Sequence, residues 1–304
     1  MIKKYLEFIK ESSESIDSIC QKYNIQNYTI NEDGSIDVAG NVYLNEENLT
    51  KLPLKFRNVD GYFDCGNNQL TNLEGAPQTV GGYFRCDNNR LTSLKGAPQT
   101  VGGGFYCHNN QLTNLEGAPQ TVDGGFNCYD NQLTSLEGGP KSVGGDFDCS
   151  YNQLANLEGA PKTVGGDFDC SDSQLTSLKG GPQTVGENFY CHNNELTNLD
   201  GGPNYIKGNF YCSDNPLLVK LTNDILDIEG DFYLNNTPLK VLWHEVLKGD
   251  NKFLDYLNTQ TWDNVFPDPK TVYEDYFLEG VEENEIEIPE NWKELLEGDG
   301  WTII

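Results

Sequence analysis

The 304-residue sequence lacks any apolar run that approaches about 18 residues, so it offers no candidate for a membrane-spanning helix. It is also poor in basic residues, with 20 Lys and Arg against 47 Asp and Glu and a formal net charge of −27. Proteins that bind nucleic acid are expected to carry a basic surface, so this balance argues against direct contact with DNA or RNA. Where charge guides recognition, the partner is expected to be basic.

The N-terminal segment lacks the uninterrupted apolar core of a signal peptide, because Glu7, Lys10 and Glu11 break it. Its apolar residues instead recur near one face of a helix: Ile2, Leu6, Ile9, Ile16 and Ile19. We therefore expect an amphipathic helix over residues 1–24. We also expect a cytoplasmic protein, whose nine cysteines lie in a reducing setting.

The sequence is dominated by a repeat of 21 residues, of which FYCHNNQLTNLEGAPQTVDGG is a typical unit. Each unit has a phenylalanine two residues before a cysteine and a leucine five residues after it; all but the last have a second leucine eight residues after it. Weaker copies flank this array, which gives about ten coils over residues 40–241. The cysteines that mark the units are Cys65, Cys86, Cys107, Cys128, Cys149, Cys170, Cys191 and Cys212.

The phenylalanine and cysteine of each unit alternate with outward residues, which is the periodicity of a β-strand. One short strand per coil predicts a parallel sheet built from neighbouring coils. An asparagine three residues after the cysteine, present in most units, is placed to satisfy backbone groups where the chain leaves the strand. Segments that contain glycine and proline supply the turns. The expected fold is a repeat solenoid.

This order of features resembles the leucine-rich repeat family, whose core reads L-x-x-L-x-L-x-x-N-x-L. Phenylalanine and cysteine replace two of the leucines, as in the series Val101, Phe105, Cys107, Asn110 and Leu112. The motif LTSLEG-x-P-x-x-VGG-x-FxC is similar to the repeats of proteins from tailed phages and some bacteria. The segment YTINEDGSIDVAGNVYLNEENLTKLPLKF looks like the segment that precedes the repeats in those proteins. The resemblance implies a leucine-rich-repeat-like solenoid with its parallel sheet on the concave face and short or irregular turns on the convex side.

A solenoid must cover its two exposed ends. We expect an N-terminal cap over residues 1–39, made of the helix and a hairpin around Asn31–Ser35, before the solenoid of residues 40–241. Residues 242–304 are rich in aromatic and acidic side chains, which predicts a folded, α-rich acidic cap. We interpret its charge as a solvated cap surface, with a second contact region as the alternative.

The cysteine column raises the question of a disulfide framework or a string of metal ions. Each cysteine occupies an inward position, where free cysteine packs as a small apolar residue. No C-x-x-C pair and no His–Cys spacing typical of zinc is present. We therefore expect core packing, with no metal and no cofactor; metal or redox chemistry is the alternative. Because no cysteine follows Cys212, a separate nucleophilic domain like that of ubiquitin-ligase effectors is excluded.

The outward strand positions vary from unit to unit, and we expect them to hold the functional site. Four aspartates form a carboxylate square on two adjacent strands: Asp146, Asp148, Asp167 and Asp169. Like charges opposite one another on a sheet cost up to about 1 kcal/mol, which a bound cation would offset. Tyrosine, which flanks the square, is enriched in binding surfaces. The alternatives are solvated charges in a recent duplication and ordinary cross-strand stacking of tyrosines. The candidate binding residues are Tyr106, His108, Tyr129, Asp146, Asp148, Asp167, Asp169, Tyr190, His192 and Tyr211.

These residues favour a protein–protein interaction module, not an enzyme, that binds a basic protein partner through its concave face. Because the repeat motif resembles that of phage proteins, we expect a phage-encoded inhibitor of a host or defence protein that handles nucleic acid. A structural or assembly protein is the alternative. A carbohydrate-active enzyme is the least favoured, because paired carboxylates about 5 Å apart suit retaining glycosidases but a flat exposed ladder offers no means of raising one pKa. The sequence contains no EF-hand or RTX-type loop that would support calcium binding.

Overall fold

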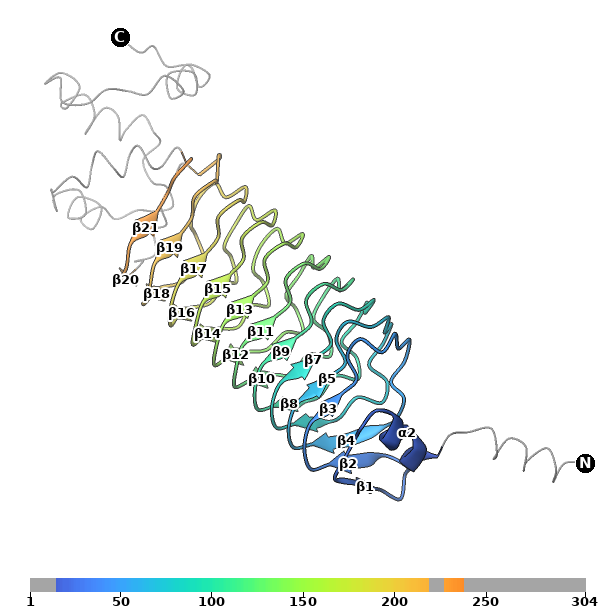
Figure 1. The fold of residues 1–304 in the computed structure, drawn as a ribbon. Coiled ribbons are helices and arrows are strands. Elements are labelled where there is room, and N and C mark those ends of the chain that lie inside the picture. Colours follow the sequence, from blue (N-terminus) through green and yellow to red (C-terminus); the bar gives the residue numbers. More distant parts are fainter. Residues whose placement is uncertain (1–14, 219–226, 238–304) are drawn as a thin grey trace, which may run out of the picture.

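The computed structural model describes residues 15–218 and 227–237, which form a β-solenoid with very little helix (Figure 1). The coils stack into two sheets that run along the described chain, one of 11 strands and one of 10. Successive coils pair in parallel and in register, as where Phe126 lies beside Phe147, 21 residues later. The ten-stranded sheet corresponds to about nine turns. The expected solenoid with a parallel sheet is therefore confirmed.

Each coil contributes a short strand to each sheet. The ten-stranded sheet contains β3 (Val42–Tyr43), β5 (Phe63–Asp64), β7 (Phe84–Arg85), β9 (Phe105–Tyr106), β11 (Phe126–Asn127), β13 (Phe147–Asp148), β15 (Phe168–Asp169), β17 (Phe189–Tyr190), β19 (Phe210–Tyr211) and β21 (Phe232–Tyr233). The eleven-stranded sheet contains β1 (Tyr28–Ile30), β2 (Ile36–Val38), β4 (Phe56–Val59), β6 (Thr79–Val80), β8 (Thr100–Val101), β10 (Thr121–Val122), β12 (Ser142–Val143), β14 (Thr163–Val164), β16 (Thr184–Val185), β18 (Tyr205–Ile206) and β20 (Asp227–Ile228).

The eleven-stranded sheet corrects the expectation of one strand per coil. Its strands form where a threonine or serine precedes a valine in most coils, because β-branched residues favour extended backbone. In β10 the side chain of Thr121 is exposed while that of Val122 is buried. The valine column of the sequence is therefore the inward side of a second sheet.

Inward side chains form continuous columns through the solenoid. The phenylalanine, the cysteine, both leucines and the valine are almost fully buried in every coil between Cys65 and Cys191. Most neighbouring phenylalanine rings of the ten-stranded sheet stack, as where Phe126 and Phe147 lie 5.5 Å apart between centroids at 10°. Phe189 and Phe210 instead meet edge to face at 87°. Each of the nine cysteines is buried and free, as core packing predicts. In the last unit Leu218, rather than the expected Leu217, is the buried residue.

Asparagine side chains form a second inward ladder that joins neighbouring coils, except at the unit of Cys170, where Ser173 takes the place of the asparagine. Asn131 donates its amide to the carbonyl oxygens of Cys107 at 3.2 Å and Cys128 at 3.0 Å. Its Oδ1 accepts the backbone N–H of Leu112 at 3.0 Å. Buried backbone groups need such partners, so this ladder confirms the role expected of the asparagine.

The N-terminal end of the described chain carries α2 (Ile16–Lys22) and the antiparallel pair β1 and β2. Cys20 lies on the inner side of this helix, and only 1% of the surface of Cys20 is exposed. The expected hairpin is present, closed by a hydrogen bond from the Asn31 N–H to the Ser35 carbonyl at 2.8 Å. Both elements lie against the first coils.

Two expectations fall on residues outside the described part. They are the first half of the N-terminal helix, within residues 1–14, and the acidic cap of residues 242–304. Within the ranges that the structure describes, no helix is long and apolar enough to span a membrane.

Candidate functional site

The outward side chains of the ten-stranded sheet form one surface, which we call the outer face. It comprises the residues three before, one before and one after each cysteine from Cys65 to Cys212. Strand register aligns them in columns, so that Asp148 lies beside Asp169 and Tyr190 beside Tyr211. Only one Lys or Arg occupies any of these positions, namely Arg85.

The register divides the predicted site residues into groups. The four aspartates lie on β13, β15 and the turns that lead into them, and Tyr190, Tyr211 and His192 follow on the next coils. Tyr106, His108 and Tyr129 lie on the N-terminal side of the aspartates. The outer face is thus acidic at its centre and aromatic on both sides.

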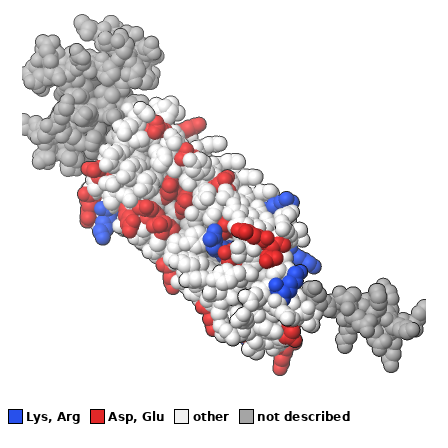
Figure 2. Space-filling view, viewed as in Figure 1, with Lys and Arg blue, Asp and Glu red and all other residues white. Residues whose placement is uncertain are grey.

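Three carboxylates converge at this centre, and Figure 2 shows acidic side chains gathered over β13 and β15. One oxygen from each of Asp146, Asp167 and Glu187 lies within 4.8 Å of the other two. Asp146 Oδ1 accepts the backbone N–H of Asp167 at 2.9 Å, and Asp167 Oδ1 accepts that of Asn188 at 2.8 Å. These bonds fix the orientation of both aspartates and leave each a second oxygen. We call these three residues the acidic cluster.

Glu187 belongs to this cluster although the sequence-based prediction did not include it. The position four residues before the cysteine is glycine in every other unit of the array. This single replacement of glycine by glutamate is the feature of the sequence that could have identified Glu187. The oxygen ligands of the cluster suit either a hard cation such as Ca²⁺ or the side chain of a Lys or Arg.

Asp148 and Asp169, the other half of the carboxylate square, are bound by serines of their own coils. Ser150 donates its backbone N–H at 3.1 Å and its hydroxyl at 2.6 Å to Asp148. Ser171 binds Asp169 in the same way, at 2.9 and 2.6 Å. Burial raises the pKa of Asp148, although the hydrogen bonds from Ser150 oppose it. The expectation that nothing on this face raises a carboxyl pKa was therefore wrong.

The tyrosines on the C-terminal side of the acidic cluster stack on one another. The rings of Tyr190 and Tyr211 are parallel and 4.7 Å apart, as are those of Tyr211 and Tyr233. His192 meets Tyr190 edge-on at 6.3 Å. Cross-strand stacking, which was the alternative reading of these residues, is thus observed. Because the ring faces cover one another, their edges and hydroxyl groups remain for a partner.

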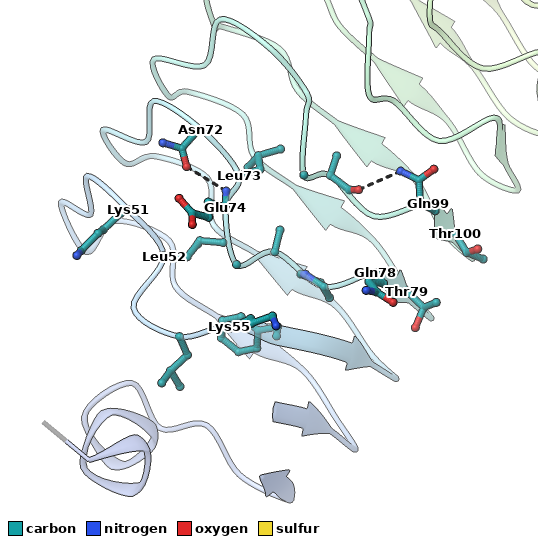
Figure 3. A pocket seen from close by; sticks show the side chains of 17 residues that line it. Lys51, Leu52, Lys55, Asn72, Leu73, Glu74, Gln78, Thr79, Gln99 and Thr100 are labelled. Carbon is teal, nitrogen blue, oxygen red and sulfur yellow. Dashed lines mark hydrogen bonds between the residues drawn. The ribbon is translucent and has the colours of Figure 1, made fainter. Parts of the chain in front are cut away.

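A hollow of about 930 Å³ lies apart from the outer face, beside turns of the first coils (Figure 3). Its lining includes the apolar residues Leu52 and Phe56 and the charged residues Lys51, Lys55 and Glu74. None of the predicted site residues lines it. It contains no histidine and no cysteine, and Glu74 is its single carboxylate.

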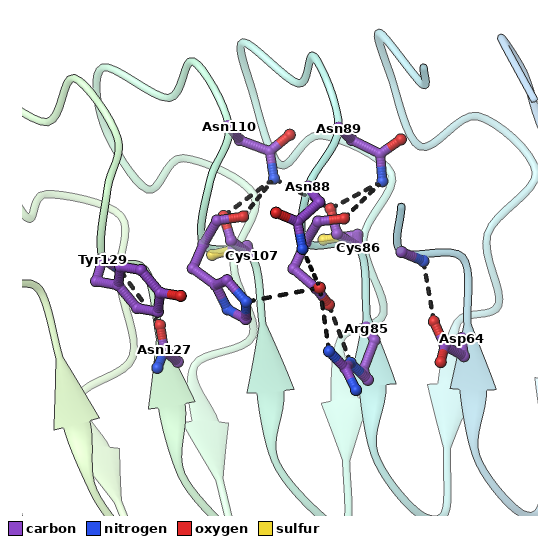
Figure 4. A network of polar contacts seen from close by, with 12 residues as sticks. Asp64, Arg85, Cys86, Asn88, Asn89, Cys107, Asn110, Asn127 and Tyr129 are labelled. Carbon is purple, nitrogen blue, oxygen red and sulfur yellow. Dashed lines mark hydrogen bonds and ion pairs between the residues drawn. The ribbon is translucent and has the colours of Figure 1, made fainter. Parts of the chain in front are cut away.

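A polar network occupies the N-terminal part of the outer face (Figure 4). The fully buried carboxylate of Asp87 accepts two hydrogen bonds from Arg85, at 3.0 and 3.1 Å, and one from Asn88 at 2.9 Å. His108 Nε2 lies 3.6 Å from the same carboxylate. The imidazole also stacks on Tyr129, with centroids 4.6 Å apart and an angle of 9°. The one basic side chain of the outer face is therefore already paired.

His108 is unusual within this network because its Nδ1 is buried and has no hydrogen-bond partner in the described chain. Burial lowers the pKa of His108, although the negative charge of Asp87 opposes the shift. Arg85 and Asp87 were absent from the predicted site. Their pairing across the turn of one coil could not be inferred from the column pattern alone.

Tyr151 stands out among the residues two after each cysteine. All of these residues have a positive φ, and all the others in the array are Asn or Asp, which tolerate that conformation. Tyr151 has a φ of 52° and is 59% exposed. The negative charge of Asp172, on the next coil, raises its pKa. This bulky side chain lies beside the carboxylate square in a conformation that its residue type disfavours.

No protein-family model matches this chain, and no curated protein matches it significantly. The geometry of the outer face is therefore the basis for a functional assignment.

Proposed function

We propose that this chain is a binding protein that holds a basic protein partner on its outer face. The observation that carries the proposal is the acidic cluster, in which oxygens of Asp146, Asp167 and Glu187 lie within 4.8 Å of one another. No Lys or Arg of the outer face is free to neutralise it, because Arg85 is bound to Asp87. A guanidinium or ammonium group from a partner supplies the missing charge.

Electrostatics and contact area make different contributions to binding in such an interface. An exposed ion pair contributes about 0–1 kcal/mol, so the carboxylates mainly steer and orient the partner. The tyrosines on both sides offer large, rigid contact area at low entropic cost. Tyr106, Tyr129, Tyr190 and Tyr211 are all half-buried, which leaves part of each side chain for contact.

The finer form of this proposal comes from the sequence. The coils are taken as leucine-rich-repeat-type, with the ten-stranded sheet as the concave face. The partner is a host or defence protein that handles nucleic acid in the bacterial cytosol, and the chain is a phage-encoded inhibitor of it. The net charge of −27 supports this form, because an acidic surface competes with nucleic acid for a basic one.

The test compares proteins captured from bacterial lysate by the wild-type chain and by the triple variant Asp146→Asn, Asp167→Asn, Glu187→Gln. The asparagines preserve the fold, because Asn188 already accepts the next N–H in the same way at 2.9 Å. A matched control neutralises three exposed carboxylates elsewhere: Asp123→Asn, Glu137→Gln and Glu195→Gln.

We expect a basic protein captured by the wild-type chain and by the control to be lost from the triple variant. Direct titration of the purified partner should then show at least about a tenfold weaker affinity, the equivalent of 1.4 kcal/mol. The same captured proteins with all three chains would refute the proposal.

The raised pKa of Asp148 favours a second function, hydrolysis of a polysaccharide. Asp148 would act as the general acid and Asp169, on the adjacent strand, as its partner carboxylate. Incubation with a panel of polysaccharides tests this function. Reducing sugar released by the wild-type chain and not by Asp148→Asn would support it, whereas equal release would eliminate it.

A further inference from the structure

The acidic groups of the outer face repeat along the axis of the solenoid. Asp148 and Asp169 are direct neighbours across β13 and β15, and Asp146 and Asp167 occupy equivalent positions one coil apart. Adjacent strands of a sheet lie about 4.8 Å apart. A partner that follows the axis therefore meets a new row of outward positions about every 4.8 Å, and two adjacent rows carry the four aspartates.

The backbone of the partner must present side chains at a matching interval, because the outward positions recur once per coil. One turn of an α-helix rises 5.4 Å, so residues at i, i+4 and i+7 project from one face about once per coil. In a β-strand, residues i and i+2 are about 6.6–6.8 Å apart. The mismatch is about 0.6 Å per coil for a helix and about 2 Å for a strand. Over two coil steps it reaches about 1.2 Å against about 4 Å, and only the first lies within the reach of flexible side chains.

The width of the outer face fits the same element. The positions from three before to one after a cysteine lie four residue steps apart, about 13 Å of extended chain. An α-helix with its side chains is about 10–12 Å wide. Gly104 and Gly125 occupy the third position before the cysteine on two coils, and the Tyr106 ring lies over Gly104.

The length of the helix follows from the aromatic residues on either side of the acidic cluster. Tyr106 lies on β9 and Tyr211 on β19, five strands farther along the sheet. Five steps of about 4.8 Å give about 24 Å, the length of about 16 helical residues. Cations at the middle of such a helix face the acidic cluster, and apolar side chains at its two ends face the tyrosines.

We infer that the outer face receives one basic, amphipathic helix of the partner protein, lying along the solenoid axis. This inference rests on the proposed function and specifies the element that the partner presents. The coil spacing, the strip width and the order aromatic–acidic–aromatic all bear on it. Charge complementarity with the acidic cluster, whose three oxygens lie within 4.8 Å of one another, selects the occupant.

The experiment uses fluorescein-labelled peptides of about 18 residues, in an alanine and glutamine background, with the full-length protein. The first peptide carries arginines at i, i+4 and i+7 near its middle and leucines at both ends of the same face. The second has the same composition with its arginines distributed around the helix. The third is the first with a central proline, which breaks the helix. Affinities are measured by fluorescence anisotropy.

We expect the first peptide to bind at least tenfold more tightly than the other two. The variant Asp146→Asn, Asp167→Asn, Glu187→Gln should reduce it to their level, and the control Asp123→Asn, Glu137→Gln, Glu195→Gln should leave it unchanged. Equal binding of the first and third peptides, tighter binding of the third, or no binding of the first would each overturn the inference. If the capture of basic proteins still depends on the acidic cluster in that case, only the inference of a helical partner is refuted. If that dependence is also absent, the proposed function is refuted as well.

Discussion

The inward columns and the outer face alternate along the same two-residue strands, yet they differ in what they tolerate. In β13, Phe147 is almost fully buried between two identical rings, while Asp148 beside it is partly open to solvent. Truncating a buried phenylalanine costs about 3–5 kcal/mol, whereas exposed substitutions usually change stability by less than about 0.5 kcal/mol. The outer face can therefore change from coil to coil while the inward columns hold the fold. Its differences are the part of the sequence available for recognition.

Thiol reactivity gives the largest expected contrast between the two. Burial raises the pKa of the Cys149 thiol, and every cysteine of the chain is buried. Alkylation then requires local opening, which should slow it by at least about a thousandfold relative to an exposed thiol. The reference is Gln153→Cys, an exposed position of the same coil. Mass spectrometry after iodoacetamide treatment should find one modified cysteine in this variant and none in the wild type; rapid modification of the native cysteines would contradict the buried column.

The asparagine ladder should show the next largest effect. Asn131→Ala removes four hydrogen bonds and leaves the buried N–H of Leu112 without its acceptor. The carbonyl oxygens of Cys107 and Cys128 each lose one of two asparagine donors. We expect a loss of about 2–4 kcal/mol in the free energy of unfolding, measured by urea denaturation. Gln132→Ala, one residue away and exposed, should change it by less than about 0.5 kcal/mol. Similar losses in both variants would mean that the ladder does not hold neighbouring coils together.

The inward columns were predictable from sequence because burial and coil stacking impose one residue type on each position. The 21-residue spacing alone was enough to place Phe126 beside Phe147 and to assign the asparagines their role. The second sheet was missed because each repeated strand has one inward residue, the valine, and no second inward residue follows it at a spacing of two. In the ten-stranded sheet the cysteine continues the alternation that the phenylalanine begins. Leu217 was misplaced because the last coil is one residue longer, so that β21 follows β19 by 22 residues.

The outer face was predictable only in part, for a related reason. Strand alternation places Asp148 and Asp169 outward, and their adjacency follows from the repeat length. Glu187 lies in a turn, outside the alternating positions. The pairing of Arg85 with Asp87 depends on side-chain rotamers that no column pattern encodes. Contacts between unlike residues needed the structure.

Tyr151 is an exception to the contrast between inward columns and outer residues, because its positive φ lowers the stability of the fold. Replacement by asparagine, the usual residue of this left-handed column, should raise the free energy of unfolding by about 0.5–1 kcal/mol. The reverse exchange, Asn109→Tyr, supplies the matched control and should lower it by a similar amount. Both are read by urea denaturation. If Tyr151→Asn destabilises the chain, the tyrosine packs as a structural residue, and its exposure gives no reason to assign it to binding.

His108 offers the smallest expected effect, because it lies on the outer face yet only 13% of its side chain is exposed. Its pKa is lowered by burial, so the unfolded chain binds a proton more readily than the folded one. The stability it contributes is present above about pH 6.5, its unfolded value, and is lost as the pH falls through the folded value. NMR titration should give His108 a midpoint below 6.5, and Asp87→Asn should lower that midpoint further by removing the opposing charge. A midpoint at or above 6.5 would show that Asp87 outweighs burial, and that this part of the outer face is open to solvent.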